Sequence, residues 1–121
     1  MLLPYKNRSY AIGLTWSVEP TKAKIRERLK EAPGASYVRV DKHSKDADAH
    51  LGLFKGRIKG TVYSAALAIA AVEPSCIVYE SIADDTVWVC VLVNGLPLPG
   101  LDTLVKPEEG QKILHDHIAH A

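Results

Sequence analysis

The sequence predicts an α+β domain, with a mainly antiparallel sheet and about three helices. An alanine-rich helix pattern at residues 63–72 is followed by two apolar strand-like runs, residues 76–79 and 87–93, joined through a short polar turn. Asn94-Gly95, the composition of a tight hairpin turn, comes next. Strands connected by short turns pair antiparallel, whereas parallel strands need long crossovers. The second half of the chain therefore predicts the fold class.

The chain begins with a strand and a helix. Residues 9–18 are rich in apolar, β-branched and aromatic side chains without helical periodicity, which predicts a strand. Residues 21–31 place a thin apolar stripe among charged side chains and end before Pro33-Gly34. This pattern predicts an amphipathic helix whose cationic face is exposed.

A hairpin is expected next. Residues 37–40 alternate as a half-buried strand, and residues 50–54 form a second short apolar run. A polar loop at 41–48 separates the two runs, and we expect them to pair with each other. A strand, a helix and a hairpin in this order would make a ferredoxin-like start with an added hairpin.

The remaining elements complete a layered plan. The helix at 63–72 is expected to pack centrally, because its alanines allow close approach to a sheet. The run at 87–93 is almost continuously apolar, which is typical of a strand covered on both faces. Pro97 and Pro99 confine the chain after it to a sheet edge. Pro107 begins a final helix that extends to about residue 117.

The bulk properties bound the function. A chain of 121 residues fits a single domain, residues 1–121, and its 15 basic against 14 acidic residues give no field that would attract nucleic acid. The longest apolar block is about half of the ~20 residues that cross a bilayer, so any membrane anchor would lie outside this chain. Cys76 and Cys90 lie in apolar runs, which suggests a reducing compartment, although a disulfide across paired strands stays open.

No set of residues predicts a metal or a cofactor. His117 and His120 could share a helix face, but His115 points away and no nearby cysteine completes a zinc site. The aspartates of the loop at 41–48 lack the glycine and the terminal glutamate of a calcium-binding loop. A frayed helix end and a polar turn are therefore the favoured interpretations.

Catalysis is not predicted either. The glycine-punctuated loop at 56–61 precedes a helix, but it lacks the Walker spacing and the lysine before its threonine. No serine has the glycines of a nucleophile elbow, and both cysteines lie in apolar runs. The sequence therefore favours a non-enzymatic protein that works through its surfaces. The candidate partner-binding residues are basic, and they are Lys22, Lys24, Arg26, Arg28, Lys55, Arg57 and Lys59.

Four segments carry a resemblance to a known family, namely residues 11–16, 59–68, 87–91 and 93–102. Together they resemble the N-terminal cytoplasmic domain of type IVb pilus biogenesis proteins of the PilO and BfpC group, over nearly the whole chain. The resemblance implies a scaffold on the cytoplasmic side of the bacterial inner membrane. It would dock the pilus assembly ATPase and other inner-membrane pilus proteins, and a membrane helix outside this chain would anchor it.

The same resemblance implies an architecture related to the cytoplasmic domains of the type II secretion platform and, more distantly, to actin-like (RNase H-like) folds. Actin-like ATPases carry an Asp-x-Gly pattern on their first strand, whereas this chain has Ala11 before Gly13. That departure argues against nucleotide binding. A small cytosolic nucleotide-binding protein or enzyme is the alternative, and a free-standing homodimer is a third possibility.

Overall fold

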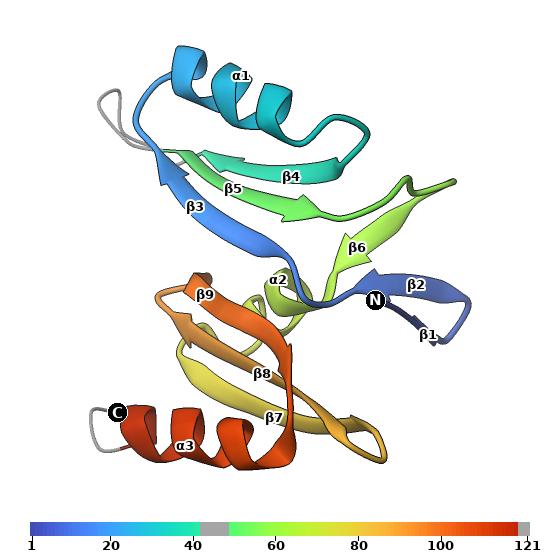
Figure 1. Cartoon of the computed structure of the whole chain (residues 1–121), viewed down its shortest axis with the longest axis vertical. Coiled ribbons are helices and arrows are strands. Elements are labelled where there is room, and N and C mark those ends of the chain that lie inside the picture. The colour runs from blue at the N-terminus through green and yellow to red at the C-terminus, as the bar shows by residue number, and fades with distance from the viewer. Residues whose placement is uncertain (42–48, 119–121) are drawn as a thin grey trace.

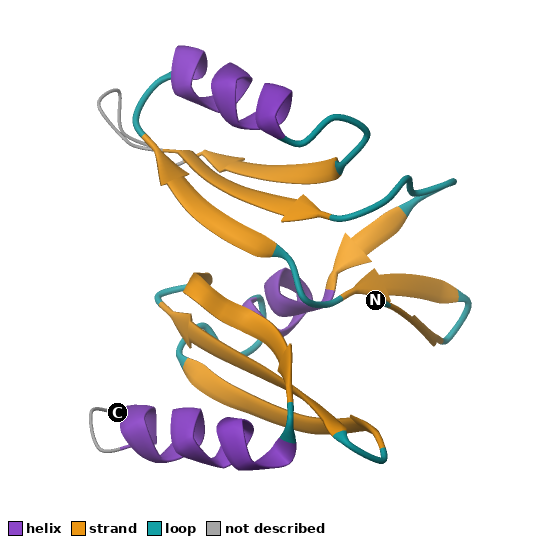
Figure 2. Ribbon diagram, viewed as in Figure 1, coloured by secondary structure: helices purple, strands orange, loops and turns teal. Residues whose placement is uncertain are grey.

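The computed structural model describes residues 1–41 and 49–118, and it is an α+β domain (Figure 1). Within these residues the strands form three sheets of three strands each, and antiparallel pairing dominates. The predicted single sheet is therefore wrong in number, although the fold class is confirmed. Figure 2 shows α1 and α3 on the two outer faces of the molecule and α2 between the sheets.

The upper lobe contains one sheet and one helix. Its elements are β3 (Thr15–Glu19), α1 (Lys22–Glu31), β4 (Ser36–Asp41) and β5 (Ala49–Phe54). The strand order is β3-β5-β4, and β5 runs antiparallel to both neighbours, so β3 and β4 are parallel with β5 between them. Ile25 of α1 is buried with Ala49 and Leu51, which places α1 over one face of this sheet. The predicted hairpin of residues 37–40 and 50–54 is confirmed.

The lower lobe is an antiparallel meander followed by a helix. Its elements are β7 (Cys76–Ala83), β8 (Thr86–Val93), β9 (Leu96–Val105) and α3 (Pro107–Ile118). Asn94 and Gly95 have positive φ angles of 51° and 89°, which is the backbone of a type I′ hairpin turn. As predicted, β8 is the buried central strand, β9 lies at the sheet edge, and the last helix begins at Pro107.

The third sheet corrects two predicted elements. It contains β1 (Leu2–Tyr5), β2 (Arg8–Ala11) and β6 (Val62–Ser64) in the order β1-β2-β6. The predicted strand at 9–18 is split into β2 and β3, because Gly13 between them has a φ of +79° that no strand adopts. The strand β1 is a further element that no residue pattern predicted.

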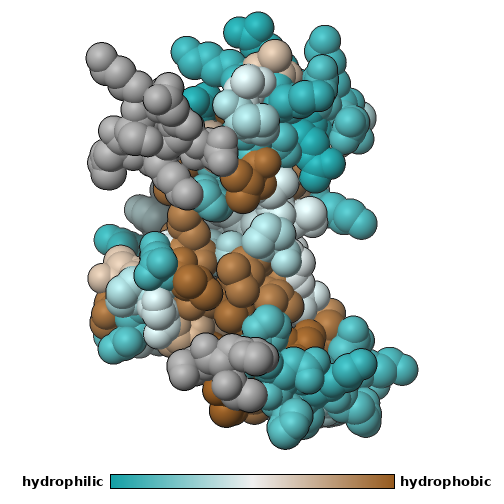
Figure 3. All heavy atoms as spheres, turned by 90° about the vertical axis from the view of Figure 1, so that its left-hand side faces the viewer, coloured by the Kyte–Doolittle hydropathy of each residue, from teal (hydrophilic) through white to brown (hydrophobic). Residues whose placement is uncertain are grey.

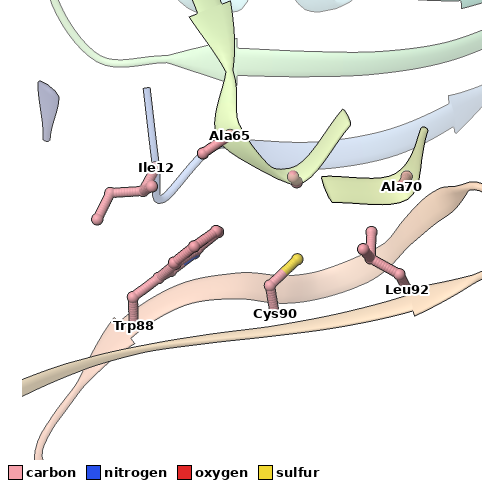
Figure 4. Close-up of a cluster of buried hydrophobic side chains, with 7 residues drawn as sticks. Ile12, Ala65, Ala70, Trp88, Cys90 and Leu92 are labelled. Atoms are coloured by element: carbon pink, nitrogen blue, oxygen red, sulfur yellow. The ribbon is translucent and has the colours of Figure 1, made fainter. Parts of the chain in front are cut away.

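The central helix is shorter than predicted. The helix α2 (Ala65–Ala70) begins two residues later than the predicted start at position 63, because residues 62–64 pair with β2 as a parallel strand. The Ser64 hydroxyl accepts a hydrogen bond from the Leu67 amide at 3.2 Å and caps the helix. The alanines of α2 lie directly on β8 in a cluster drawn in Figure 4, with Ile12, Ala65, Ala70, Trp88, Cys90 and Leu92.

Both cysteines are free thiols. The sequence left open a disulfide between them, and the strand register shows how they lie. Cys76 lies opposite Leu92, and Cys90 lies opposite Val78, so the two cysteines are not cross-strand partners. Burial raises the pKa of the Cys90 thiol strongly, with the charge of Asp102 adding to the effect. Burial, followed by the charge of Glu73, also raises the pKa of Cys76.

We expect the two thiols to differ in reactivity. At pH 8 a thiol-specific disulfide reagent should modify half-buried Cys76 slowly, and Cys90 at the rate of global unfolding, because both stay protonated and Cys90 is shielded. Because the raised pKa favours the protonated thiol in the folded state, stability should fall as the pH rises above the ordinary value of 9.0. Equal rapid labelling of Cys76 and Cys90 in native protein would contradict the burial of Cys90.

Candidate docking site

A groove of about 360 Å³ lies between the upper lobe and the central elements. The start of β4, the end of β5, the strand β6 and the first residues of α2 form its walls. Its lining residues are Ala11, Leu14, Ser36, Tyr37, Val38, Phe54, Ile58, Val62, Tyr63, Ser64, Leu67 and Ala68. We call this cavity the upper groove.

The floor of the upper groove is apolar. Leu14 is buried, and Val38, Phe54 and Leu67 pack against the same hydrophobic cluster. Because side chains alternate along a strand, Val38 and Phe54 face the groove while α1 covers the opposite side of the sheet. The upper groove thus opens on the face of the sheet that α1 leaves uncovered.

A basic segment borders the upper groove. The Ser36 hydroxyl donates a hydrogen bond to the Gly56 carbonyl at 3.1 Å and accepts one from the Ile58 amide at 3.2 Å. These bonds fasten residues 55–60 to the start of β4. The side chains of Lys55, Arg57 and Lys59 are exposed, and Ile58 between them lines the groove.

Arg8 lies on the face of the β1-β2-β6 sheet that is turned away from the upper groove, because Ala11 and Val62 occupy the groove face. The Arg8 guanidinium is 5.1 Å from the centre of the Tyr63 ring, a cation–π distance. The Tyr63 ring also lies 5.9 Å from the ring of Tyr10. We therefore define the basic rim as Lys55, Arg57 and Lys59 alone.

The basic residues of α1 belong to a different surface. Lys22, Lys24 and Arg26 are exposed on α1, on the side of the sheet away from the upper groove. Arg28 makes two ion pairs, with Glu19 at 3.2 Å and with Glu31 at 3.4 Å. The Glu19 side chain is only 11% exposed, so Arg28 compensates the charge of a largely buried carboxylate. Arg28 therefore has a structural role. The structure therefore does not bring the seven predicted residues into one patch.

One buried carboxylate has a role that the residue patterns did not predict. Asp102 of β9 is 3% exposed and accepts three hydrogen bonds, from the Gly13 amide at 2.9 Å and from the Trp16 and Trp88 indole nitrogens at 2.8 Å each. Trp16 belongs to β3 and Trp88 to β8, so Asp102 joins the upper lobe to the lower lobe. An acidic residue within a strand, in a chain with two tryptophan donors, was the available signal.

The lower lobe carries a second, larger groove of about 670 Å³ between its sheet and α3. Its lining residues are Ser75, Cys76, Ile77, Val91, Leu92, Val93, Leu98, Leu114, His117 and Ile118. Val93 and Ile118 are 43% and 57% exposed. Figure 3 shows hydrophobic side chains gathered on this side of the lower half of the molecule. Nothing in the groove specifies the charge or shape of what would cover it.

Other expectations from the sequence are tested only in part. Among residues 1–41 and 49–118, no group of three or more histidine, cysteine, aspartate or glutamate side chains is placed to hold a metal ion. His120 and positions 42–48 of the polar loop lie outside the described residues. Over the same described residues, no helix is long and apolar enough to cross a membrane.

Comparison with known proteins adds no relative. A scan against protein-family models, a search of curated proteins and a search of solved structures each found no match for this chain. The upper groove and its basic rim are therefore interpreted from their own chemistry.

Proposed function

We propose that this domain is a non-enzymatic docking module of the inner-membrane platform for type IV pilus biogenesis. It would lie on the cytoplasmic side of the bacterial inner membrane and bind the pilus assembly ATPase together with other platform proteins. The pilus setting rests on the resemblance of the four sequence segments described above. The docking function rests on the upper groove.

One observation carries the docking function, namely the fastening of a basic segment to the border of an apolar groove. An apolar floor with a charged border is the usual plan of a protein interface, in which the floor supplies affinity and the border supplies selectivity. The two hydrogen bonds of Ser36 hold the segment of Lys55, Arg57 and Lys59 in place. A binding surface ordered in advance loses less entropy when its partner arrives.

The test is capture of the assembly ATPase by the immobilised domain from the cytoplasmic proteins of a type IV pilus-bearing bacterium. We expect mass spectrometry to identify the ATPase, and high salt to weaken its capture because exposed charges are screened. The variant with Lys55→Glu, Arg57→Glu and Lys59→Glu should lower affinity at least about tenfold, equivalent to about 1.4 kcal/mol. As a control, Lys112→Glu at an exposed position of α3 should leave the capture unchanged.

A second set of variants tests which basic surface binds. Lys22→Glu, Lys24→Glu and Arg26→Glu reverse the same number of charges on α1, far from the upper groove. If these substitutions abolish capture while the variant with Lys55→Glu, Arg57→Glu and Lys59→Glu retains it, α1 is the docking surface and the groove proposal is wrong. If the ATPase is never captured and the domain instead binds ATP with magnesium in calorimetry, the nucleotide-binding alternative replaces the docking proposal.

A further inference from the structure

The upper groove is bordered by two strands that each lie at the end of a sheet. Among residues 1–41 and 49–118, β4 is last in the order β3-β5-β4, and β6 is last in the order β1-β2-β6. Residues of both strands line the groove, with Ser36, Tyr37 and Val38 from β4 and Val62, Tyr63 and Ser64 from β6. A terminal strand presents unpaired N–H and C=O groups along one side, and an extended peptide can pair with them.

β4 is the better of the two templates. It spans six residues, Ser36–Asp41, whereas β6 spans three. None of the six residues of β4 is proline, so each keeps its backbone N–H donor. Val38 and Ser36 are its residues on the groove face of the sheet, while the neighbouring Tyr37 pairs with Leu53 and shares the face that α1 covers. The apolar side chains of Leu14 and Phe54 lie within the same cavity.

The charges around the groove select the partner. The basic rim contributes three cations, and none of the lining residues of the upper groove is acidic. Residues 55–60 contain three cations and no acid. An acidic segment would be drawn to this border, and a basic one would be repelled, because opposite potentials favour encounter.

We propose that the upper groove binds an extended acidic segment of a partner protein, which adds to the edge of β4 and inserts an apolar side chain over Leu14 and Phe54. This inference rests on the proposed docking function and specifies its ligand. A segment of about six residues would match the length of β4. Its side chains would alternate between the groove face and the opposite face of the sheet. Carboxylates on the segment would meet Lys55, Arg57 and Lys59.

The experiment is a titration of the nitrogen-15-labelled 121-residue chain with a synthetic peptide, acetyl-Asp-Leu-Glu-Val-Asp-Leu-Glu-amide, followed by NMR. We expect amide shifts to change in β4, in β6 and in residues 55–60, and amide exchange to slow in β4. The variant with Lys55→Glu, Arg57→Glu and Lys59→Glu should bind at least tenfold more weakly. A peptide with lysine in place of each acid should not bind.

Two further peptides test strand addition itself. In each, alternate backbone nitrogens are methylated, one peptide for each of the two alternating sets, while the side chains stay unchanged. Alternate N–H groups of a strand point to the same side, so one methylated set should lose at least tenfold in affinity and the other should bind. Equal binding by both sets, shifts confined to α1 or the lower lobe, or no binding would overturn the inference.

Its failure is distinguishable from failure of the proposed function. If the acidic peptide does not bind but the ATPase is still captured, the pilus docking function stands and uses a partner of different shape. If the peptide binds at β4 but the ATPase is never captured, the groove specificity stands and the pilus setting is wrong.

Discussion

Replacing Asp102 by alanine is expected to destabilise the domain by about 4 kcal/mol or more, since hydrogen bonds to a charged group contribute about 1.5–3 kcal/mol each. Three donors lose their acceptor, namely the Gly13 amide and the indole nitrogens of Trp16 and Trp88. Both indoles are buried, so water cannot readily replace the carboxylate. Urea denaturation followed by tryptophan fluorescence measures the loss.

A milder variant keeps this prediction testable if Asp102→Ala does not fold. Asp102→Asn preserves the shape, and its amide oxygen can replace Oδ1, which accepts from Gly13 and Trp88. The amide nitrogen then faces the indole N–H of Trp16, which has lost its acceptor Oδ2. Trp16→Phe should therefore cost less in the Asp102→Asn background than in the natural protein. Additive costs in this double-mutant cycle would show that the Asp102–Trp16 bond contributes nothing.

Replacing Gly110 by alanine should destabilise the domain by about 1–3 kcal/mol, the usual cost of an overpacked site. In an exposed helix the same change would stabilise by about 1 kcal/mol, because alanine has the higher helix propensity. Here a Cβ on Gly110 would lie 2.6 Å from Cγ2 of Val87 and 3.1 Å from Cε2 of Tyr79. Valine is stiff at its branched carbon, so α3 must move away from β8. Urea denaturation measures the change.

A second substitution tests the cause of this loss. Val87→Ala removes the methyl groups that the new Cβ would meet, so it should cost less in the Gly110→Ala background than alone. Lys112→Ala, at an exposed position of the same helix, should change stability by less than about 0.5 kcal/mol. If Gly110→Ala stabilised the domain as it would an isolated helix, the close packing of α3 on β8 would be refuted.

The groove illustrates what could not be predicted from residue patterns. The basic segment of Lys55, Arg57 and Lys59 was evident as a charge cluster, and its exposure followed from its composition. Its attachment to β4 depends on Ser36, which is distant in sequence and ordinary in type. Arg28 was grouped with its exposed helical neighbours, although its ion pair with buried Glu19 of β3 gives it a structural role.

By itself the sequence determined the class of the domain and most of its elements. Alternation, apolar runs and turn residues act over a few positions, so the hairpin of β4 and β5, the Asn94-Gly95 turn, the buried strand β8 and the helix beginning at Pro107 were predicted. These features depend on local backbone preferences and on the period of burial.

The tertiary structure decided how these elements divide into three sheets and where the groove opens. Gly13 ends one strand and starts another because its amide reaches Asp102, 89 positions away, in a left-handed backbone conformation. Residues 62–64 became a strand because β2 was available for pairing, and the groove exists because β4 and β6 ended on either side of it. Such contacts depend on which distant segments meet, and local patterns carry no record of that choice.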